Sequence, residues 1–304
     1  MILNKADKTK AITLIHHAAQ GFGRFPPSSL AALKSCLEGG ALAVEVDIIP
    51  LLDGEFVLLH DPQLQTSTNG AGNAARLTRQ DLQSLYYKVD GAVTDEGLGF
   101  LDQALDLVED NCKLGKLQLD LKPYSTLTPP IFEGFLRLIE PVRERVQVSC
   151  VGDWVIRSLH QLSPGLNLGF DPLLYLDVVE DEPRSEGIPP FRVGTYGYLD
   201  DHPLSAQRWG ELKEYFAARA EALLVQAVPG CEWFIHADLL ANALEAGFNW
   251  IGCLHEHGHR VDAWTLDPDK DECVALANKL VKMGVDEITS NDPVGLSRLL
   301  DSEP

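Results

Sequence analysis

The stretch VEVDIIPLLDGEFVLLHD, residues 44–61, places Glu45, Asp47 and His60 within some of the most apolar sequence of this chain. Side chains two residues apart on a β-strand point to the same face, so Glu45 and Asp47 project together while the aliphatic residues beside them face the other way. Burying a charge costs several kcal/mol unless another group pairs with it. The stretch therefore predicts a strand with one apolar face and one face in a polar site.

Short β-type runs recur along the chain, separated by stretches with the apolar period of a helix. The nine runs are residues 11–15, 42–49, 56–60, 116–121, 145–151, 166–170, 221–227, 261–266 and 286–290. Strands that alternate with helices are parallel strands joined by crossovers. So many repeats in 304 residues favour a closed α/β fold, a (β/α)8 TIM barrel, over an open sheet. One of the nine runs is then expected outside the barrel.

The helices carry recognisable ends, and two segments break the rhythm. Residues 28–40, SSLAALKSCLEGG, begin at a serine cap and end at glycine. We expect a single domain over residues 1–304. Residues 61–115 and 171–219 are expected to be loop or insertion regions over the active-site face, because long loops that a fold keeps often cover a site.

The acidic composition limits the possible partners. The net charge is −20 at pH 7, so the surface repels nucleic acid and anionic membranes. We expect no nucleic acid partner and no stable membrane association. A small anionic substrate fits only a site that carries its own positive charge. The oligomeric state is not specified by these features.

Cysteine usage and hydropathy bear on the compartment. The six cysteines form no C-x-x-C pair, which indicates reduced, buried thiols rather than a disulfide framework or a zinc site. The N-terminal segment lacks the apolar region and cleavage site of a secretory signal, and no run of about 18 apolar residues could span a membrane. The expected location is cytoplasmic.

A second strand repeats the pattern of the first. In KLQLDLKP, residues 116–123, the leucines form one face, while Asp120 and Lys122 lie on the other. Asp120 can join Glu45 and Asp47 as a third carboxylate at strand ends. Carboxylates so close repel one another unless a divalent cation binds between them. Hard oxygen ligands favour Mg²⁺ or Ca²⁺ over zinc or copper, so the cofactor expected is one such cation.

Histidines stand at strand ends as well. The first run is followed directly by His16 and His17, and the third run ends in His60. In a (β/α)8 barrel the C-terminal ends of the strands form the catalytic face. An imidazole with an unperturbed pKa of about 6.5 suits proton transfer near neutral pH.

Several of these residues also have structural interpretations. A Glu-x-Asp pair is often a structural ion pair, and Lys122 could be no more than the partner of a buried carboxylate. His255, His257 and His259 alternate in LHEHGHRV as zinc ligands might, but they stand at a predicted helix end. A solvated helix C-terminus, where histidine complements the helix dipole, is the preferred interpretation there.

The order of these motifs resembles the glycerophosphodiester phosphodiesterase family over residues 12–293. The resemblance is carried by VEVDIIPLLDGEFVLLHDPQLQTSTNGAG, by the D-L-K strand, by AWTLD and by ITSNDP. It implies a TIM barrel that uses a divalent metal to cleave glycerophosphodiesters into glycerol 3-phosphate and an alcohol.

The resemblance also implies residue roles. Glu45 and Asp47 match two metal ligands, and Asp120 stands where the family usually has a third ligand, a glutamate. His16 and His60 match the general acid/base pair. Lys122 matches a phosphate-contacting lysine, and Trp264 matches an aromatic residue that lines the substrate pocket. His17 is a further candidate for substrate binding.

The chain departs from the family pattern at two motifs. The family's His-Arg-Gly reads His16-His17-Ala18, and its Pro-Glu-Asn-Thr reads Pro26-Pro27-Ser28-Ser29. Arg24, in an apparent insertion, is the candidate replacement for the lost arginine. The departures leave two alternatives open: a phospholipase D-type activity on lysophospholipid or sphingomyelin, and a catalytically silent barrel that binds phosphate esters.

Overall fold

Eight parallel strands close into a barrel in the computed structural model, which describes residues 2–3, 12–179 and 192–302. They are β2 (Ile12–His16), β3 (Ala43–Pro50), β7 (Lys116–Leu121), β8 (Val146–Cys150), β9 (Asn167–Phe170), β13 (Glu232–His236), β14 (Arg260–Trp264) and β15 (Glu287–Ser290). Strand β2 pairs with β15 on one side and with β3 on the other, which closes the ring. The predicted (β/α)8 TIM barrel is confirmed.

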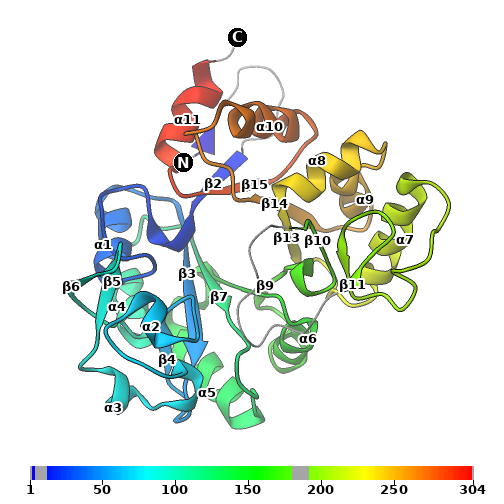
Figure 1. The fold of residues 1–304 in the computed structure, drawn as a ribbon. Helices are drawn as coiled ribbons and strands as arrows, with labels where there is room; N and C mark the ends of the chain where they lie inside the picture. Colours follow the sequence, from blue (N-terminus) through cyan, green and yellow to red (C-terminus); the bar gives the residue numbers. More distant parts are fainter. Residues whose placement is uncertain (1, 4–11, 180–191, 303–304) are drawn as a thin grey trace.

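Helices follow the strands and surround the barrel (Figure 1). They are α1 (Leu30–Glu38), α4 (Leu101–Glu109), α5 (Pro129–Ile139), α6 (Asp153–Leu162), α7 (Leu212–Leu224), α8 (Ala237–Glu245), α9 (Trp250–Glu256), α10 (Asp271–Lys282) and α11 (Pro293–Ser302). Helix α1 has the predicted ends: the Ser29 hydroxyl accepts a hydrogen bond from the Ala32 N–H at 3.1 Å, and the helix stops at Gly39. Such a cap is worth about 1 kcal/mol.

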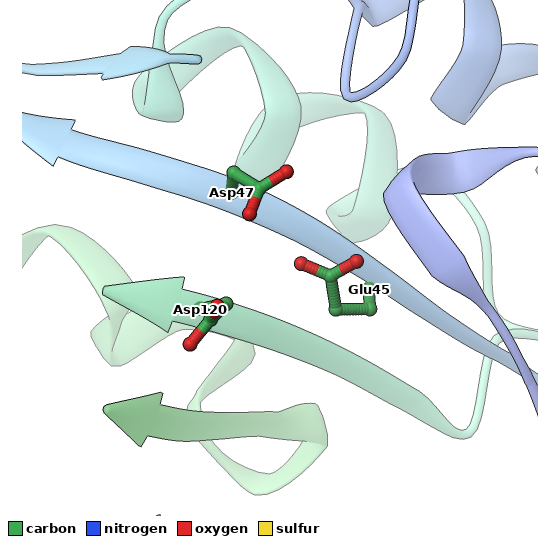
Figure 2. A group of neighbouring side chains, drawn as sticks. All are labelled: Glu45, Asp47 and Asp120. Atoms are coloured by element: carbon green, nitrogen blue, oxygen red, sulfur yellow. The ribbon is translucent and has the colours of Figure 1, made fainter. Parts of the chain in front are cut away.

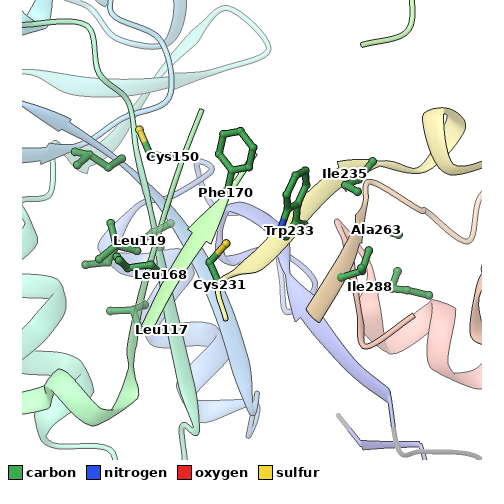
Figure 3. Close-up of a cluster of buried hydrophobic side chains, with 14 of the residues drawn as sticks. Leu117, Leu119, Cys150, Leu168, Phe170, Cys231, Trp233, Ile235, Ala263 and Ile288 are labelled. Carbon is green, nitrogen blue, oxygen red and sulfur yellow. The ribbon is translucent and has the colours of Figure 1, made fainter. Parts of the chain in front are cut away.

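The main core lies between strands and helices. Every second residue of each strand points outward into it, as Leu117 and Leu119 do on β7 and Val44 and Val46 do on β3. Figure 3 shows this layer, in which Leu168, Phe170, Trp233 and Ile288 come from other strands of the barrel. The remaining residues of each strand face the lumen, so the period of two seen in the sequence decides which carboxylates point inward.

One predicted strand is wrong, one barrel strand was missed, and the run expected outside the barrel can be identified. Residues 221–227 are not a strand, because α7 runs through Leu224. Strand β13 was not predicted, because its apolar residues are few and lie between Glu232 and His236. A short apolar run cannot be assigned to helix or strand by period alone. The 56–60 run forms β4 (Phe56–Leu58), which pairs antiparallel with β3 and lies outside the barrel.

Between β3 and α4 the chain makes a long excursion, residues 51–100, called here the β3–β7 excursion. It contains β4, α2 (Leu64–Ser67), a 3-10 turn (Ala74–Arg76), α3 (Arg79–Leu82) and the hairpin of β5 (Tyr86–Val89) and β6 (Ala92–Gly97). A second apolar cluster, separate from the main core, holds it together; its members include Leu51, Val57, Leu59, Leu64, Leu82, Tyr87 and Phe100. The Tyr87 hydroxyl donates to the Leu58 carbonyl at 2.6 Å, tying the hairpin to β4.

A second excursion follows β9, at residues 171–211, of which 180–191 lie outside the described residues. It carries a 3-10 turn (Pro172–Leu174) and a small sheet of β10 (Leu176–Asp177), β12 (Leu199–Asp200) and β11 (Arg192–Val193). Arg219 of α7 holds this sheet. Its guanidinium lies 3.0 Å from the Asp200 carboxylate and also pairs with Asp201, and the Tyr215 hydroxyl donates to Asp200 at 2.8 Å.

Replacing Arg219 with methionine is expected to destabilise the protein by about 3–5 kcal/mol, because Asp200 would stay buried without its cation. Both side chains are almost fully buried, at 3% and 0% exposure. Urea unfolding measures the effect. Lys34→Met is the control: its pair with Glu38 is long, at 3.9 Å, and exposed, so its loss should cost less than about 0.5 kcal/mol. Equal effects of the two changes would contradict the assignment of a buried pair.

The N-terminal end of the barrel is closed by paired charges. Lys116 contacts Glu232 at 3.1 Å and also Glu287, and Arg260 contacts Glu287 at 2.7 Å. These side chains line a hollow of about 410 Å³. Both cations are paired with the two glutamates, which indicates a structural role for these charges. In a (β/α)8 barrel the catalytic face is the opposite, C-terminal end.

Two features of the chain bear on its environment. All six cysteines are free, as predicted, but only Cys36, Cys150 and Cys231 are buried; Cys112 is exposed, and Cys253 and Cys273 are partly exposed. Within the described part of the chain, no helix has both the length and the apolar character needed to cross a bilayer.

Candidate active site

Three carboxylates meet at the C-terminal ends of two neighbouring strands. Glu45 and Asp47 come from β3, and Asp120 comes from β7, where it is the register partner of Asp47. Figure 2 shows the three side chains turned toward one another. One oxygen from each lies within 4.8 Å of the others. The strand period thus brings together the three acidic residues that the sequence singles out.

Glu45 is almost fully buried, with 3% exposure. Its Oε2 accepts a hydrogen bond from the Ala18 N–H at 2.6 Å, and its Oε1 has no hydrogen-bond partner among the described residues. Ala18 can aim its N–H at the site because its backbone is left-handed, with φ 47°. A buried carboxylate oxygen without a partner is costly, which indicates that something else binds there.

Lys122 lies between the other two carboxylates. Its Nζ is 2.9 Å from Asp47 Oδ1 and 2.6 Å from Asp120 Oδ2. Asp47 also accepts a hydrogen bond from the Ser28 hydroxyl at 2.9 Å, and Asp120 accepts one from the Ser149 hydroxyl at 3.0 Å. Asp47 and Asp120 are thus each oriented by a serine hydroxyl, and both contact the same Lys122 ammonium.

The charges do not balance. Burial, and then the neighbouring Asp47 and Asp120, raise the pKa of Glu45 well above its usual range. Burial opposes ionisation of Asp47 too, but the Lys122 ammonium lowers its pKa. Three carboxylates therefore face one ammonium, and Glu45 is the one left without a counter-charge.

This donor set fits a divalent cation. Carboxylate oxygens are the ligands that Mg²⁺ and Ca²⁺ prefer, and a cation bound among them would supply the missing charge and a partner for Glu45 Oε1. Glu45, Asp47 and Asp120 are the residues that would hold it, with Lys122 beside them.

Of the two adjacent histidines, His17 and not His16 faces this site. His16 shares the outward face of β2 with Leu14 and is 2% exposed. Its Nδ1 lies 2.6 Å from the Gln20 carbonyl oxygen, and its ring stacks on Phe22 with 5.0 Å between the ring centroids. Burial lowers its pKa. It does not line the cavity of the site. The expectation that the His16 side chain points into the site is therefore wrong. The side chain of the next residue, His17, is the one that points inward.

His17 begins the turn after β2. Its Nε2 lies 3.9 Å from Glu45 Oε2, and its Nδ1 lies 2.8 Å from Asn291 Oδ1. With His17 taken as the histidine of the family's first motif, the motif reads His17-Ala18-Ala19 in this chain. The residue that follows the histidine is then Ala18, whose N–H binds Glu45.

His60 reaches the site from the opposite side. Because β4 runs antiparallel to β3, it carries the chain back toward the carboxylates, and the Leu59 N–H donates to the Asp47 carbonyl at 3.2 Å. His60 Nδ1 lies 3.1 Å from Asp61 Oδ1. The Lys122 charge lowers the pKa of His60, but the Asp61 hydrogen bond and the Asp47 charge outweigh it, and the pKa is raised.

The side chains surround a cavity of about 140 Å³. Its lining comprises His17, Glu45, His60, Gln118, Asp120, Lys122, Ser149, Val151, Asp171, Leu173, Phe234, Trp264, Thr265 and Thr289. Trp264, singled out from the sequence, thus lies in the wall, and its Nε1 is buried without a hydrogen-bond partner among the described residues. The volume suits a small polar ligand.

Two other sequence candidates lie elsewhere. Arg24 is exposed and does not belong to the cavity lining, so the structure does not bring it to the carboxylates. The three alternating histidines make no cluster: His255 Nε2 binds Asp286 at 2.8 Å, while His259 is buried beside Cys231. The predicted solvated helix end holds for the exposed His257, which binds its own helix, and not for His259.

Sequence reasoning missed several residues of the site. Asp171 and Ser149 line the cavity because they stand at the ends of β9 and β8, both of which were predicted, so the signal was present but weak. Asn291 and Asp267 were quoted only as parts of motifs. Asn291 contacts His17, and Asp267 accepts hydrogen bonds from Asn291.

Comparison with known proteins points in one direction. The model of the glycerophosphoryl diester phosphodiesterase family matches residues 20–134. A glycerophosphodiester phosphodiesterase of Caldanaerobacter subterraneus is 24% identical over 280 residues, covering 90% of this chain and 92% of the relative. A Mycobacterium tuberculosis protein named "Probable glycerophosphodiester phosphodiesterase 1" is 35% identical over 261 residues, covering 80% of this chain and 88% of its own length.

Solved structures with the same fold include enzymes of this kind. A glycerophosphodiester phosphodiesterase from Parabacteroides distasonis superposes with a TM-score of 0.65 at 17% identity, covering 96% of this chain and 97% of the other. A phosphodiesterase from Oleispira antarctica, solved in complex with its product sn-glycerol-3-phosphate, gives a TM-score of 0.62 at 20% identity, with 95% and 97% covered. At these identities the likeness shows a shared fold.

Proposed function

Because this chain belongs to the glycerophosphodiester phosphodiesterase family, we propose that it hydrolyses glycerophosphodiesters to glycerol 3-phosphate and an alcohol. The observation that carries the proposal is the meeting of Glu45, Asp47 and Asp120 in one cavity with two histidines. The relatives support the substrate class, and the Oleispira complex shows that this fold accommodates glycerol 3-phosphate in that protein.

The proposal includes one bound divalent cation, Mg²⁺ or Ca²⁺, held by Glu45, Asp47 and Asp120. When bound, such a cation acts as a Lewis acid that stabilises the negative charge developing on phosphate oxygens. Lys122, fixed between Asp47 and Asp120, adds a positive charge at the same edge of the cavity. Trp264 forms part of the cavity wall beside these groups.

The two histidines move the protons. His60 donates its Nδ1–H to the Asp61 carboxylate, which stabilises an imidazolium and leaves its Nε2–H to protonate the departing alcohol. His17 has a neutral amide at Nδ1, and its Nε2 accepts the proton of the attacking hydroxyl, whether that hydroxyl belongs to water or to the substrate's own glycerol. Each transfer contributes roughly 10² to 10⁴ in rate.

An activity assay with and without a metal chelator tests the proposal. Purified protein is given glycerophosphocholine with Mg²⁺ or Ca²⁺, and glycerol 3-phosphate and choline are measured. We expect both products, and we expect EDTA to lower the rate by more than about 10²-fold because the Lewis acid that stabilises charge on the phosphate oxygens is then lost. Restoring the cation should restore the rate. Turnover that persists unchanged in EDTA would contradict the role of the three carboxylates.

A second substrate separates the alternatives. Lysophosphatidylcholine carries an acyl chain that a phospholipase D-type enzyme accepts. Release of choline from lysophosphatidylcholine but not from glycerophosphocholine would favour the phospholipase D-type activity. Binding of glycerophosphocholine without any turnover would favour a silent barrel and would overturn the proposal.

A further inference from the structure

A chain of hydrogen bonds links three adjacent strand ends to His17. Strands β14, β15 and β2 are neighbours in the barrel, and Asp267, Asn291 and His17 follow them in that order. Asp267 Oδ1 accepts from the Asn291 backbone N–H at 2.8 Å and from the Ser290 hydroxyl at 3.0 Å. Asp267 Oδ2 lies 2.8 Å from the Asn291 side-chain nitrogen, and Asn291 Oδ1 lies 2.8 Å from His17 Nδ1.

The direction of each bond follows from the groups involved. A carboxylate can only accept, so the Asn291 amide must turn its NH₂ toward Asp267. Its carbonyl oxygen is then the atom that faces His17, and a carbonyl can also only accept. His17 must therefore carry its proton on Nδ1. Its Nε2 is left free, on the side of Glu45, at 3.9 Å from Oε2.

We propose that Asn291, oriented by Asp267, is a positioning residue that holds His17 in the Nδ1-protonated tautomer with Nε2 directed at the carboxylate site. That His17 Nε2 acts as a base rests on the proposed function, whereas the tautomer of His17 does not. Asn291 itself does not line the cavity and acts through His17.

The contact between the Asn291 amide and His17 differs from a direct contact between a carboxylate and a histidine. The amide is neutral, so it fixes the ring without placing a negative charge against it. The same geometry serves both states of the ring, because Nδ1 remains a donor when Nε2 gains a proton. His17 can thus accept a proton at Nε2 and release it again without rearrangement of Asn291.

Asp267→Asn is the informative variant, because it is isosteric and Asp267 is not among the residues that line the cavity. The new side chain still has to accept from the Asn291 N–H and the Ser290 hydroxyl, so its NH₂ points at the Asn291 amide. Asn291 must then turn its oxygen toward residue 267 and its NH₂ toward His17 Nδ1, which becomes an acceptor. The proton moves to Nε2, and the base is lost from the cavity. We expect kcat to fall by about 10²-fold with KM within about threefold.

The double variant Asp267→Asn/Asn291→Asp exchanges the two side chains. The amide then donates from position 267, the carboxylate at position 291 accepts from His17 Nδ1, and the original tautomer returns. We expect kcat to recover to within about tenfold of wild type. Asn167→Leu, at an exposed position at the opposite end of the barrel, is the control and should leave kcat unchanged.

NMR of ¹⁵N-histidine-labelled protein reads the tautomer directly and requires no substrate. His17 is assigned from the signal missing in His17→Gln. We expect a protonated Nδ1 in wild type and in the double variant, and a protonated Nε2 in Asp267→Asn. A wild-type His17 protonated on Nε2, or an Asp267→Asn variant with unchanged tautomer and kcat, would overturn the inference. Because this readout is independent of turnover, failure of the proposed function is distinguishable from failure of the inference.

Discussion

His17→Gln is expected to lower kcat by roughly 10² to 10⁴-fold, whereas His16→Gln should leave kcat within about tenfold of wild type. The two residues are adjacent in the chain, but only His17 lines the cavity of the carboxylates. His16 points outward, where its ring stacks on Phe22 and its Nδ1 binds the Gln20 carbonyl. Removing it disturbs packing, while removing His17 eliminates a base.

The comparison needs two measurements for each variant. Steady-state kinetics with glycerophosphocholine gives kcat, and thermal melting shows whether the variant is folded, since His16 is buried and its replacement will lower the melting temperature. His60→Gln serves as the positive control and should lose activity by a factor similar to that for His17→Gln. The assignment would be refuted by a folded His16→Gln variant that loses more activity than His17→Gln.

Glu45→Gln is expected to abolish the stabilisation of the protein by Mg²⁺ or Ca²⁺. Wild-type protein should gain about 2.7 kcal/mol at a cation concentration of 100 times Kd. Without the Glu45 charge the affinity should fall by about 10²-fold or more, which removes this gain at the same concentration. In EDTA the variant should be at least as stable as wild type, because Glu45 is a buried carboxylate next to Asp47 and Asp120 with one oxygen unpaired.

Glu96→Gln is a matched control. Glu96 also accepts a hydrogen bond from a backbone N–H, that of Ala31 at 3.1 Å, but it lies in the β3–β7 excursion rather than among the three carboxylates. Denaturation of both variants with and without cation gives the difference. A full cation-dependent gain in Glu45→Gln would show that the ion binds elsewhere.

The barrel was predictable because its strands alternate with capped helices, and the carboxylates were predictable because a strand has a period of two. On β3 that period leaves Glu45 and Asp47 on one face, and the register with β7 places Asp120 beside Asp47. The strand period needs no tertiary information, whereas the register between β3 and β7 is known only from the structure. The strand at 221–227 failed because EALLVQA has no period that distinguishes a helix end from a buried strand.

The choice between His16 and His17 was beyond the reach of pattern alone. It depends on where β2 ends and on the left-handed turn at Ala18 and Ala19, with φ of 47° and 55°, and alanine is not a residue that signals such a turn. The position of His60 likewise depends on the antiparallel return of β4, which the apolar run 56–60 does not reveal. The link from Asp267 to His17 crosses 250 residues of sequence and becomes visible only when three strand ends meet.

The separate apolar cluster of the β3–β7 excursion has a consequence for how the protein responds to heat. His60 follows β4, whose Phe56 and Leu58 pack into the main core. The rest of the excursion is held by a much smaller core and by the bond from Tyr87 to Leu58. A unit with few buried contacts opens at a lower free energy than the whole molecule. We therefore expect the part of the excursion beyond β4 to open while the barrel remains folded. Because that part begins with Asp61, the hydrogen-bond partner of His60, turnover is expected to fall below the melting temperature of the barrel.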